Sequence, residues 1–188
     1  MAIFEIRRYK SIDHDAAWQL HNLALSLVGA HAGNGPWDDD LHSIEAVYLQ
    51  NGGEFLVGLL DGQIVAMGAL RRVDDGSADT GSADAGSADA GSADAGSADA
   101  GSADTAWAEI KRMRVHPDHQ RRGYGQAILA RLEARAVELG YTRLILDTTT
   151  VQIGAQRFYE KNGYRQFDQT TFGSFDVLLY QKELRGSP

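Results

Sequence analysis

The chain has 188 residues, of which 43% are apolar, and this length and composition indicate one globular domain with a sizeable core. It contains no cysteine, which excludes disulfides, cysteine metal sites and a cysteine nucleophile and is typical of a reducing cytoplasm. Six of its 26 acidic residues lie in a repeat at 76–105, so the rest of the chain is nearly neutral, with 20 acidic against 18 basic residues, and indicates no nucleic-acid partner.

The first half of the chain predicts a strand, two helices and a hairpin. Residues 2–9 alternate as a strand does, and Asp13 is expected to cap a helix that runs towards Gly29. A second helix is expected over 37–50. The hairpin, over 54–73, has the clearest signal in the sequence, because two apolar runs are joined by the turn dipeptide Asp-Gly.

The repeat at 76–105 consists of six pentapeptides of the GSADA type. It has no large apolar side chain to bury and a glycine at every fifth position, so the sequence predicts a disordered loop inserted between two strands. Calcium binding is the alternative. Aspartates five residues apart, however, lack the carboxylates at alternate positions that a calcium loop supplies.

The second half of the chain predicts a β-α-β unit followed by a short helix and two closing strands. Strands are expected at 106–115, 142–150, 165–171 and 174–184, and helices at 125–140 and 153–164. Together with the hairpin, this order predicts a mixed sheet with helices on both faces.

The stretch "QRRGYG" at 120–125 lies between the strand and the helix of this unit and predicts an anion site. Backbone N–H groups at a helix N-terminus bind anions, and glycines let a phosphate approach closely. The ATP-binding P-loop is excluded because Gly125 is followed by Gln126 and Ala127 rather than by Lys and Ser or Thr. A dinucleotide fold is disfavoured because its third glycine position holds Ile128 and the preceding strands form hairpins.

The loop, the strand-proline entry "VHP" before it, and the spacing of Ala155, Tyr159 and Gly163 together resemble the GNAT superfamily of N-acetyltransferases. The resemblance covers the chain except for the repeat and is weakest before residue 50. It implies an α/β (mixed α+β) GNAT fold, with a mostly antiparallel mixed sheet of six to seven strands and about four helices. Residues 1–188 are then a single domain that carries 76–105 as an insertion.

The resemblance implies acetyl-CoA as cosubstrate, no metal, and a set of residues that bind the coenzyme. Backbone amides of the loop would hold the pyrophosphate, the strand before it would bind the pantetheine arm, and one amide side chain would follow the next strand. Gln stands at that last position where the family usually has Asn. The residues concerned are Met113, Val115, Gln120, Arg121, Arg122, Gly123, Tyr124, Gly125, Gln126 and Gln152.

Two residues are candidates for proton transfer. Glu109 is the candidate general base, and as an alternating strand residue it is expected to share a face with Lys111 and Met113; a salt-bridged structural role is the alternative. Tyr159 is the candidate general acid for the departing thiolate, and the alternative is a core aromatic residue paired with Phe158.

Other polar clusters have simpler interpretations. His116 and His119 have the spacing of metal ligands, but no third ligand is apparent, and a solvated pair is favoured. The acidic run "WDDD" at 37–40 could attract a cationic acceptor, although acidic residues in the first turn of a helix are ordinary.

The function expected from the resemblance is direct acetyl transfer from acetyl-CoA to a primary amine in a ternary complex. The acceptor is a small-molecule amine or a protein amino group, and a homodimer is one expected assembly. No run of 18 apolar residues and no apolar signal segment occur, so the protein is expected in the cytoplasm without a membrane partner. The alternative is a coenzyme A-binding sensor or interaction module without turnover.

Overall fold

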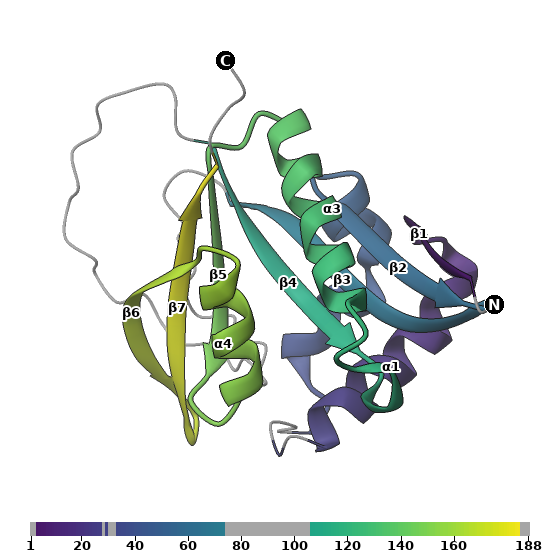
Figure 1. The fold of residues 1–188 in the computed structure, drawn as a ribbon, viewed down its shortest axis with the longest axis horizontal. Helices are drawn as coiled ribbons and strands as arrows, with labels where there is room; N and C mark the ends of the chain where they lie inside the picture. Colours follow the sequence, from purple (N-terminus) through teal and green to yellow (C-terminus); the bar gives the residue numbers. More distant parts are fainter. Residues whose placement is uncertain (1–2, 28, 30–32, 74–105, 185–188) are drawn as a thin grey trace.

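Seven strands form one sheet in this protein, whose computed structural model describes residues 3–27, 29, 33–73 and 106–184 (Figure 1). The order is β1-β2-β3-β4-β5-β7-β6, and neighbouring strands are antiparallel except for β4 and β5. The expected mixed and mostly antiparallel sheet is confirmed. The strands are β1 (Phe4–Arg8), β2 (Glu54–Leu60), β3 (Gln63–Val73), β4 (Trp107–Val115), β5 (Arg143–Thr149), β6 (Arg165–Phe172) and β7 (Phe175–Glu183).

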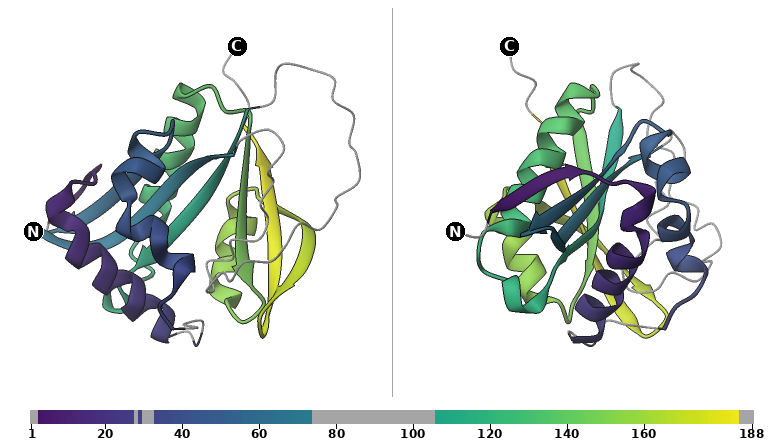
Figure 2. Two further views of the ribbon diagram at one scale, coloured as in Figure 1. Left: turned by 180° about the vertical axis from the view of Figure 1, so that it is seen from behind. Right: turned by 90° about the vertical axis from the view of Figure 1, so that its right-hand side faces the viewer.

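Helices cover both faces of this sheet. Figure 2 shows α3 and α4 on one face and the N-terminal helices on the other. Within the described residues these are α1 (His14–Leu27), α2 (Asp39–His42), α3 (Tyr124–Glu138) and α4 (Ile153–Lys161), with the short helical turns η1 (Ser11–Asp13), η2 (Pro36–Asp38), η3 (Glu45–Leu49) and η4 (Pro117–His119). Of these helices, none is both long and apolar enough to cross a membrane.

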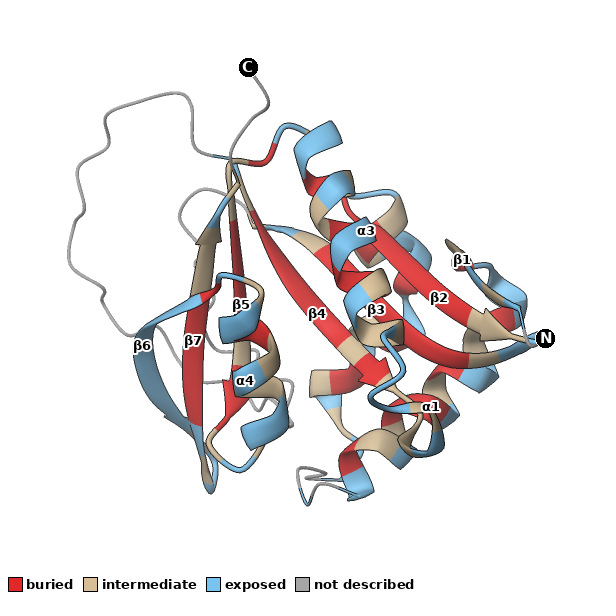
Figure 3. Cartoon of the chain, in the orientation of Figure 1, coloured by how far each residue is buried: buried red, intermediate tan, exposed pale blue. Residues whose placement is uncertain are grey.

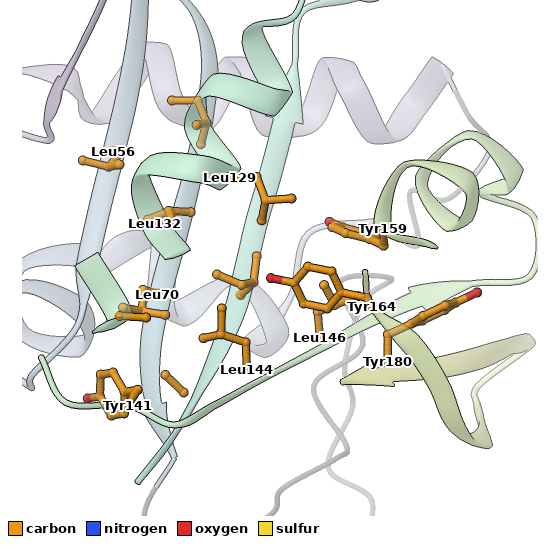
Figure 4. Packing of buried hydrophobic residues seen from close by; sticks show 14 of the residues in the cluster. Leu56, Leu70, Leu129, Leu132, Tyr141, Leu144, Leu146, Tyr159, Tyr164 and Tyr180 are labelled. Atoms are coloured by element: carbon orange, nitrogen blue, oxygen red, sulfur yellow. The ribbon is translucent and has the colours of Figure 1, made fainter. Parts of the chain in front are cut away.

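Each face of the sheet has its own core. On the face of α3 and α4, Leu129 and Leu132 pack with Leu144 and Tyr159 (Figure 4). On the face of α1, a second cluster includes Tyr48, which is fully buried. Because the central strands are covered on both sides, they are buried along most of their length, whereas the edge strand β6 is exposed (Figure 3).

The predicted hairpin is confirmed. Asp61 and Gly62 join β2 to β3 with φ angles of 49° and 85°, which is the left-handed pair that a two-residue hairpin turn needs. At its other end β3 pairs with β4 through Val73 and Trp107, so the segment between them joins adjacent antiparallel strands. The repeat at 76–105, predicted to be a disordered loop, lies outside the described residues.

The single helix expected over 37–50 is wrong. The chain forms η2, then the one-turn helix α2, and after a break at Ser43 the wide turn η3. The carbonyl of Trp37 accepts a hydrogen bond from Arg112 of β4. The segment is therefore helical in short pieces that differ in their hydrogen-bond spacing, and its first turn is held to the sheet by Arg112.

Asp13 does not cap α1 as expected. It ends the turn η1, and its carboxylate accepts hydrogen bonds from the Lys10 N–H at 2.8 Å and from the Arg7 guanidinium at 2.6 and 2.8 Å. The carboxylate that was expected to cap α1 therefore pairs with Arg7 of β1.

Candidate active site

The parallel strands β4 and β5 share only a short ladder. Residues 107–109 of β4 pair with residues 143–145 of β5, and the strands then diverge, as Figure 1 shows. β4 stays paired with β3 as far as Val115, and β5 with β7 as far as Thr149. The facing edges of both strands are therefore not used by the β4–β5 ladder beyond Glu109, and a ligand placed there can bind the backbone.

β4 carries one extra residue in the part that diverges. Ala69 of β3 pairs with Lys111, whereas Met67 pairs with Arg114, so two steps along β3 match three steps along β4. Arg112 lies in this bulge with φ = +55°, a conformation that side chains other than glycine rarely adopt.

The bulge changes which side chains of β4 share a face. Ala108 and Ile110 belong to the core under α3, so Glu109 and Lys111 point to the α1 side. Met113, however, packs against the α3-side core. The expectation that Glu109, Lys111 and Met113 share a face is therefore wrong, because one inserted residue shifts the period-two alternation.

The loop after β4 has the geometry of an anion site. Arg121 and Gly123 both have left-handed φ angles, of 59° and 87°, and Gly123 immediately precedes α3. Gly123 is followed by the right-handed first turn of α3, and a left-handed residue next to a right-handed one turns successive N–H groups towards one side, which favours an anion. A Cβ on Gly123 would meet no atom within 4 Å, and Arg121, Arg122 and Gly123 are all exposed. The structure thus leaves room for a phosphate at the positive end of the α3 dipole.

Two residues fit the loop against the end of β4. A Cβ on Gly125 would lie 3.3 Å from Cγ2 of Val115, so glycine allows α3 to begin close to the strand. The Gln120 side-chain amide donates to the Val115 carbonyl at 3.4 Å.

Tyr124 and Gln126, on either side of Gly125, link the loop to other elements. The ring of Tyr124 stacks on Phe4 of β1 with the centroids 4.1 Å apart. Gln126 donates through Nε2 to Oδ1 of Asn162 at 2.6 Å, which joins the first turn of α3 to the end of α4.

Tyr159 lies on α4 and faces the divergence from the β5 side. Its ring makes edge contacts with Phe158 and Tyr164, at centroid distances of 5.3 and 5.7 Å, and the side chain is 7% exposed. In Figure 4 its hydroxyl end points from α4 towards β4. Tyr159 is therefore a core residue through its ring, and its hydroxyl is directed to the region between the strands.

Gln152 binds the end of β5. Its Oε1 accepts hydrogen bonds from Thr148 Oγ1 at 2.9 Å and from the Thr149 N–H and Oγ1 at 3.1 and 3.2 Å. These contacts hold the side chain at the start of α4 and leave its NH2 group as the part that suits a ligand carbonyl.

Glu109 is buried in an ion-pair network on the α1 side of β4. Arg71 of β3 donates to Oε2 through Nη2 at 2.6 Å and through Nε at 3.1 Å, and Lys111 Nζ lies 3.4 Å from Oε1. Both carboxylate oxygens therefore have basic partners. Burial lowers the pKa of Arg71, but the charge and hydrogen bonds of Glu109 outweigh it and the pKa is raised.

The acidic run at 37–40 also has a basic partner. Asp38 and Asp40 both form ion pairs with Arg112, at the bulge of β4. Asp40 makes two of these hydrogen bonds and also accepts one from Tyr48, while Asp38 contacts His21 Nε2 at 3.1 Å. The charge of Arg112 offsets the two carboxylates, so they present less negative charge to an acceptor than the sequence suggested.

The histidine pair shows no ligand arrangement. His116 Nδ1 accepts from the Asp118 N–H at 3.3 Å, and the His116 and His119 rings are 5.4 Å apart at an interplanar angle of 58°. No group of three or more His, Asp or Glu side chains suited to a metal ion occurs in the described part of the chain.

Sequence reasoning missed Arg71 and Arg112, the two arginines of these networks. A signal was present, because Lys111, Arg112 and Arg114 are three basic residues in a predicted central strand, where a buried charge needs an opposite charge. The identity of the acidic partners depends on the packing of residues 37–40 on the sheet and could not be read from the spacing.

The diverging parallel strands, the loop that presents N–H groups at the start of α3 and the tyrosine on α4 define the class of protein that the sequence resembles. The chain belongs to the acetyltransferase (GNAT) family, whose model matches residues 17–164. This is a family of acyltransferase enzymes, and both the expected family and the expected fold are confirmed.

Relatives agree with this assignment. The chain is 33% identical over 58 residues to human N-acetyltransferase 8; the match covers 31% of this chain and 26% of that protein. A GNAT-family acetyltransferase from Staphylococcus aureus Mu50 has the same fold, with a TM-score of 0.75 at 18% identity over 97% of this chain and 100% of that one. A protein assigned as an acetyltransferase from Salmonella typhimurium, solved with its cofactor acetyl-CoA, gives a TM-score of 0.69 at 19% identity over 98% and 95%.

Proposed function

We propose that this protein transfers the acetyl group of acetyl-CoA to a primary amine by direct attack in a ternary complex. The observation that carries the proposal is the divergence of β4 from β5 after Glu109, next to the anion site at the start of α3. Family membership supports acetyl transfer, the human relative's name supports an amine acceptor, and the acetyl-CoA complex of the Salmonella neighbour supports the cosubstrate.

The residues at the loop suit the pyrophosphate of acetyl-CoA. The N–H groups of residues 121–126 donate to phosphate oxygens, and open space at Gly123 lets the phosphate approach the backbone. The exposed guanidinium of Arg121 or Arg122 adds a positive charge.

The pantetheine arm is proposed to lie between β4 and β5. Its amides bind the backbone of β4 near Met113 and Val115, where the ladder with β5 has ended, and the NH2 group of Gln152 donates to a pantetheine carbonyl from the opposite side. Binding of this kind lengthens the β-sheet with ligand amides and aligns the thioester with the divergence.

Proton transfer is proposed to involve Tyr159 and Glu109. The neutral amine attacks the thioester carbonyl carbon, a tetrahedral intermediate forms, and the C–S bond breaks as the Tyr159 hydroxyl gives its proton to the coenzyme A thiolate. Before the attack, the ammonium form of the acceptor loses one proton through water to Glu109, whose two oxygens also contact Arg71 and Lys111. After the attack the nitrogen loses a second proton, which returns the Tyr159 phenolate to its neutral form.

A panel of amines, including polyamines, amino acids, aminoglycosides and peptides, tests the proposal by release of coenzyme A. Because the chain has no cysteine, a thiol-reactive dye reports only the released coenzyme. We expect turnover with at least one class and intersecting lines in two-substrate kinetics. Tight acetyl-CoA binding without release for any amine would instead indicate a binding module without turnover.

A further inference from the structure

The bulge in β4 places a strained residue beside the coenzyme-binding edge. Arg112 has φ = +55°, and an L residue in this conformation costs free energy that something else in the fold must offset. The bulge lies just before Met113 and Val115, the residues proposed to bind pantetheine. Its geometry therefore sets where the following N–H and C=O groups of the strand point.

The side chain of Arg112 contacts residues 37–40 on the α1 side of the sheet. Its guanidinium donates through Nε to Asp40 Oδ2 at 2.9 Å, through Nη2 to the other Asp40 oxygen and to the Trp37 carbonyl, and through Nη1 to Asp38 Oδ1 at 3.3 Å. Arg112 and Asp38 are 2% and 3% exposed. These contacts tie the bulge to residues 37–40.

This segment is itself anchored to the core on the α1 side. Asp40 accepts a hydrogen bond from the fully buried Tyr48, and Asp38 contacts the buried His21 of α1. Although burial raises the pKa of Asp40, the nearby charge and hydrogen bonds of Arg112 outweigh it and the pKa is lowered, so the carboxylate stays ionised opposite the guanidinium.

We propose that Arg112 is a positioning residue: its clamp on residues 37–40 holds the β4 bulge and so aims the backbone that binds acetyl-CoA. The inference rests on the proposed function. A simple stabilising ion pair would lower the stability of the fold when lost without altering the coenzyme site. The contacts of Arg112, in contrast, link residues 37–40 to β4, the strand proposed to bind acetyl-CoA. Their loss therefore changes the KM for acetyl-CoA and kcat in a protein that is still folded.

The test is Arg112→Gly, because glycine adopts the positive φ without strain while the whole side chain, with its contacts to residues 37–40, is lost. In this variant we expect the KM for acetyl-CoA to rise about tenfold or more and kcat to fall by a similar factor, measured well below its unfolding temperature. Arg112→Lys keeps the charge but not the fork of donors, so it should recover part of the loss. Wild-type values of both constants in a folded Arg112→Gly protein would overturn the proposal.

A matched control is Arg7→Gln, which removes another two-bond Arg–Asp pair, with Asp13, far from β4 along the sheet. It should lower stability and leave the KM for acetyl-CoA within about twofold. If Arg112→Gly does not fold, Asp40→Asn replaces it. That variant keeps the size of the side chain and removes one of the two carboxylate charges that face Arg112, and an unchanged KM would again overturn the proposal.

Calorimetry of acetyl-CoA binding to the unaltered protein distinguishes a failure of the positioning role from a failure of the proposed acetyltransferase function. If the unaltered protein does not bind acetyl-CoA, the proposed function fails and the clamp has no coenzyme to position. If it binds acetyl-CoA and the Arg112 and Asp40 variants bind and turn over equally well, the function stands and the positioning role is wrong.

Discussion

Gly123 and Gly140 lie at the two ends of α3 with nearly equal φ angles, 87° and 84°, and a Cβ on either would meet no atom within 4 Å. Replacing each by alanine should therefore cost a similar amount of stability, about 1–2 kcal/mol for a left-handed L residue. Only Gly123→Ala puts a methyl group where the pyrophosphate is proposed to bind, so only this variant should weaken acetyl-CoA binding, by about tenfold or more. Calorimetry together with thermal unfolding measures both effects. Equal affinities of the two variants would contradict the anion site.

The hydroxyl of Tyr159 is the proposed proton donor, and Tyr159→Phe removes it while the aromatic packing stays. We expect kcat to fall by roughly 10²-fold with little change in acetyl-CoA affinity. The control is Tyr180→Phe on β7. It removes a hydroxyl that donates a hydrogen bond at 3.2 Å to Glu160, which lies on α4 next to Tyr159. It should cost about 1 kcal/mol of stability and leave kcat nearly unchanged. If the two variants turn over alike, Tyr159 is not the acid.

Acid should unfold the protein partly through Asp13 and Asp40. Hydrogen bonding by Arg7 lowers the pKa of Asp13, and Arg112, supported by Lys111, lowers that of Asp40 in spite of burial. Because both folded-state pKa values lie below the unfolded ones, this stabilisation is complete above about pH 4 and is lost as the pH falls through the folded-state values. Urea unfolding from pH 7 to pH 2.5 measures it.

Asp40→Asn supplies the comparison for this acid loss. The variant should be less stable at pH 7 and lose less stability on acidification, since one titrating carboxylate is gone. Identical slopes for variant and parent below pH 4 would show that Asp40 contributes nothing.

Among the helices and strands, the sequence predicted the ones that are specified by neighbouring residues. The hairpin of β2 and β3 follows from alternation and the dipeptide Asp61-Gly62, and α3 follows from its apolar spacing and Gly140. The positions of the strands and of the loop between β4 and α3 were likewise predicted within a few residues. In these segments tertiary contacts agree with local preference.

Two features could not be predicted because they depend on contacts between distant segments. The bulge at Arg112 changes the face of Met113, and no glycine marks it, since the ion pairs with 37–40 offset its strain. The break at Ser43 in the helix expected over 37–50 likewise has no glycine or proline to mark it in the sequence. Gln152 was found only through a family position, and its contacts with the end of β5 became visible in the structure.

For the whole molecule, the repeat is predicted to be dispensable. Val73 and Trp107 pair at the ends of β3 and β4, so a four-residue turn in place of 76–105 can join the strands. The sequence predicts a flexible chain there, and shortening it lowers the loop-closure cost by about 2 kcal/mol. We expect a small rise in unfolding temperature and steady-state constants within a few-fold. A large rise in KM for a cationic acceptor after excision, strongest at low salt, would instead assign the acidic repeat a role in substrate recruitment.

The short β4–β5 ladder also affects how easily the sheet opens locally. Three residue pairs join its two sheet halves, whereas every other neighbouring pair of described strands has at least five. Side chains such as Glu133 and Lys182, 2.7 Å apart, help to hold α3 to β7 across this seam. A coenzyme bound to both edges would close the seam, so amide hydrogen exchange in 143–149 should slow on addition of acetyl-CoA far more than in the β2–β3 hairpin. Bound acetyl-CoA would then hydrogen-bond to the edges of β4 and β5 and complete the sheet. In the free protein, the local stability of the sheet would be lowest between these two strands, where acetyl transfer is proposed to occur.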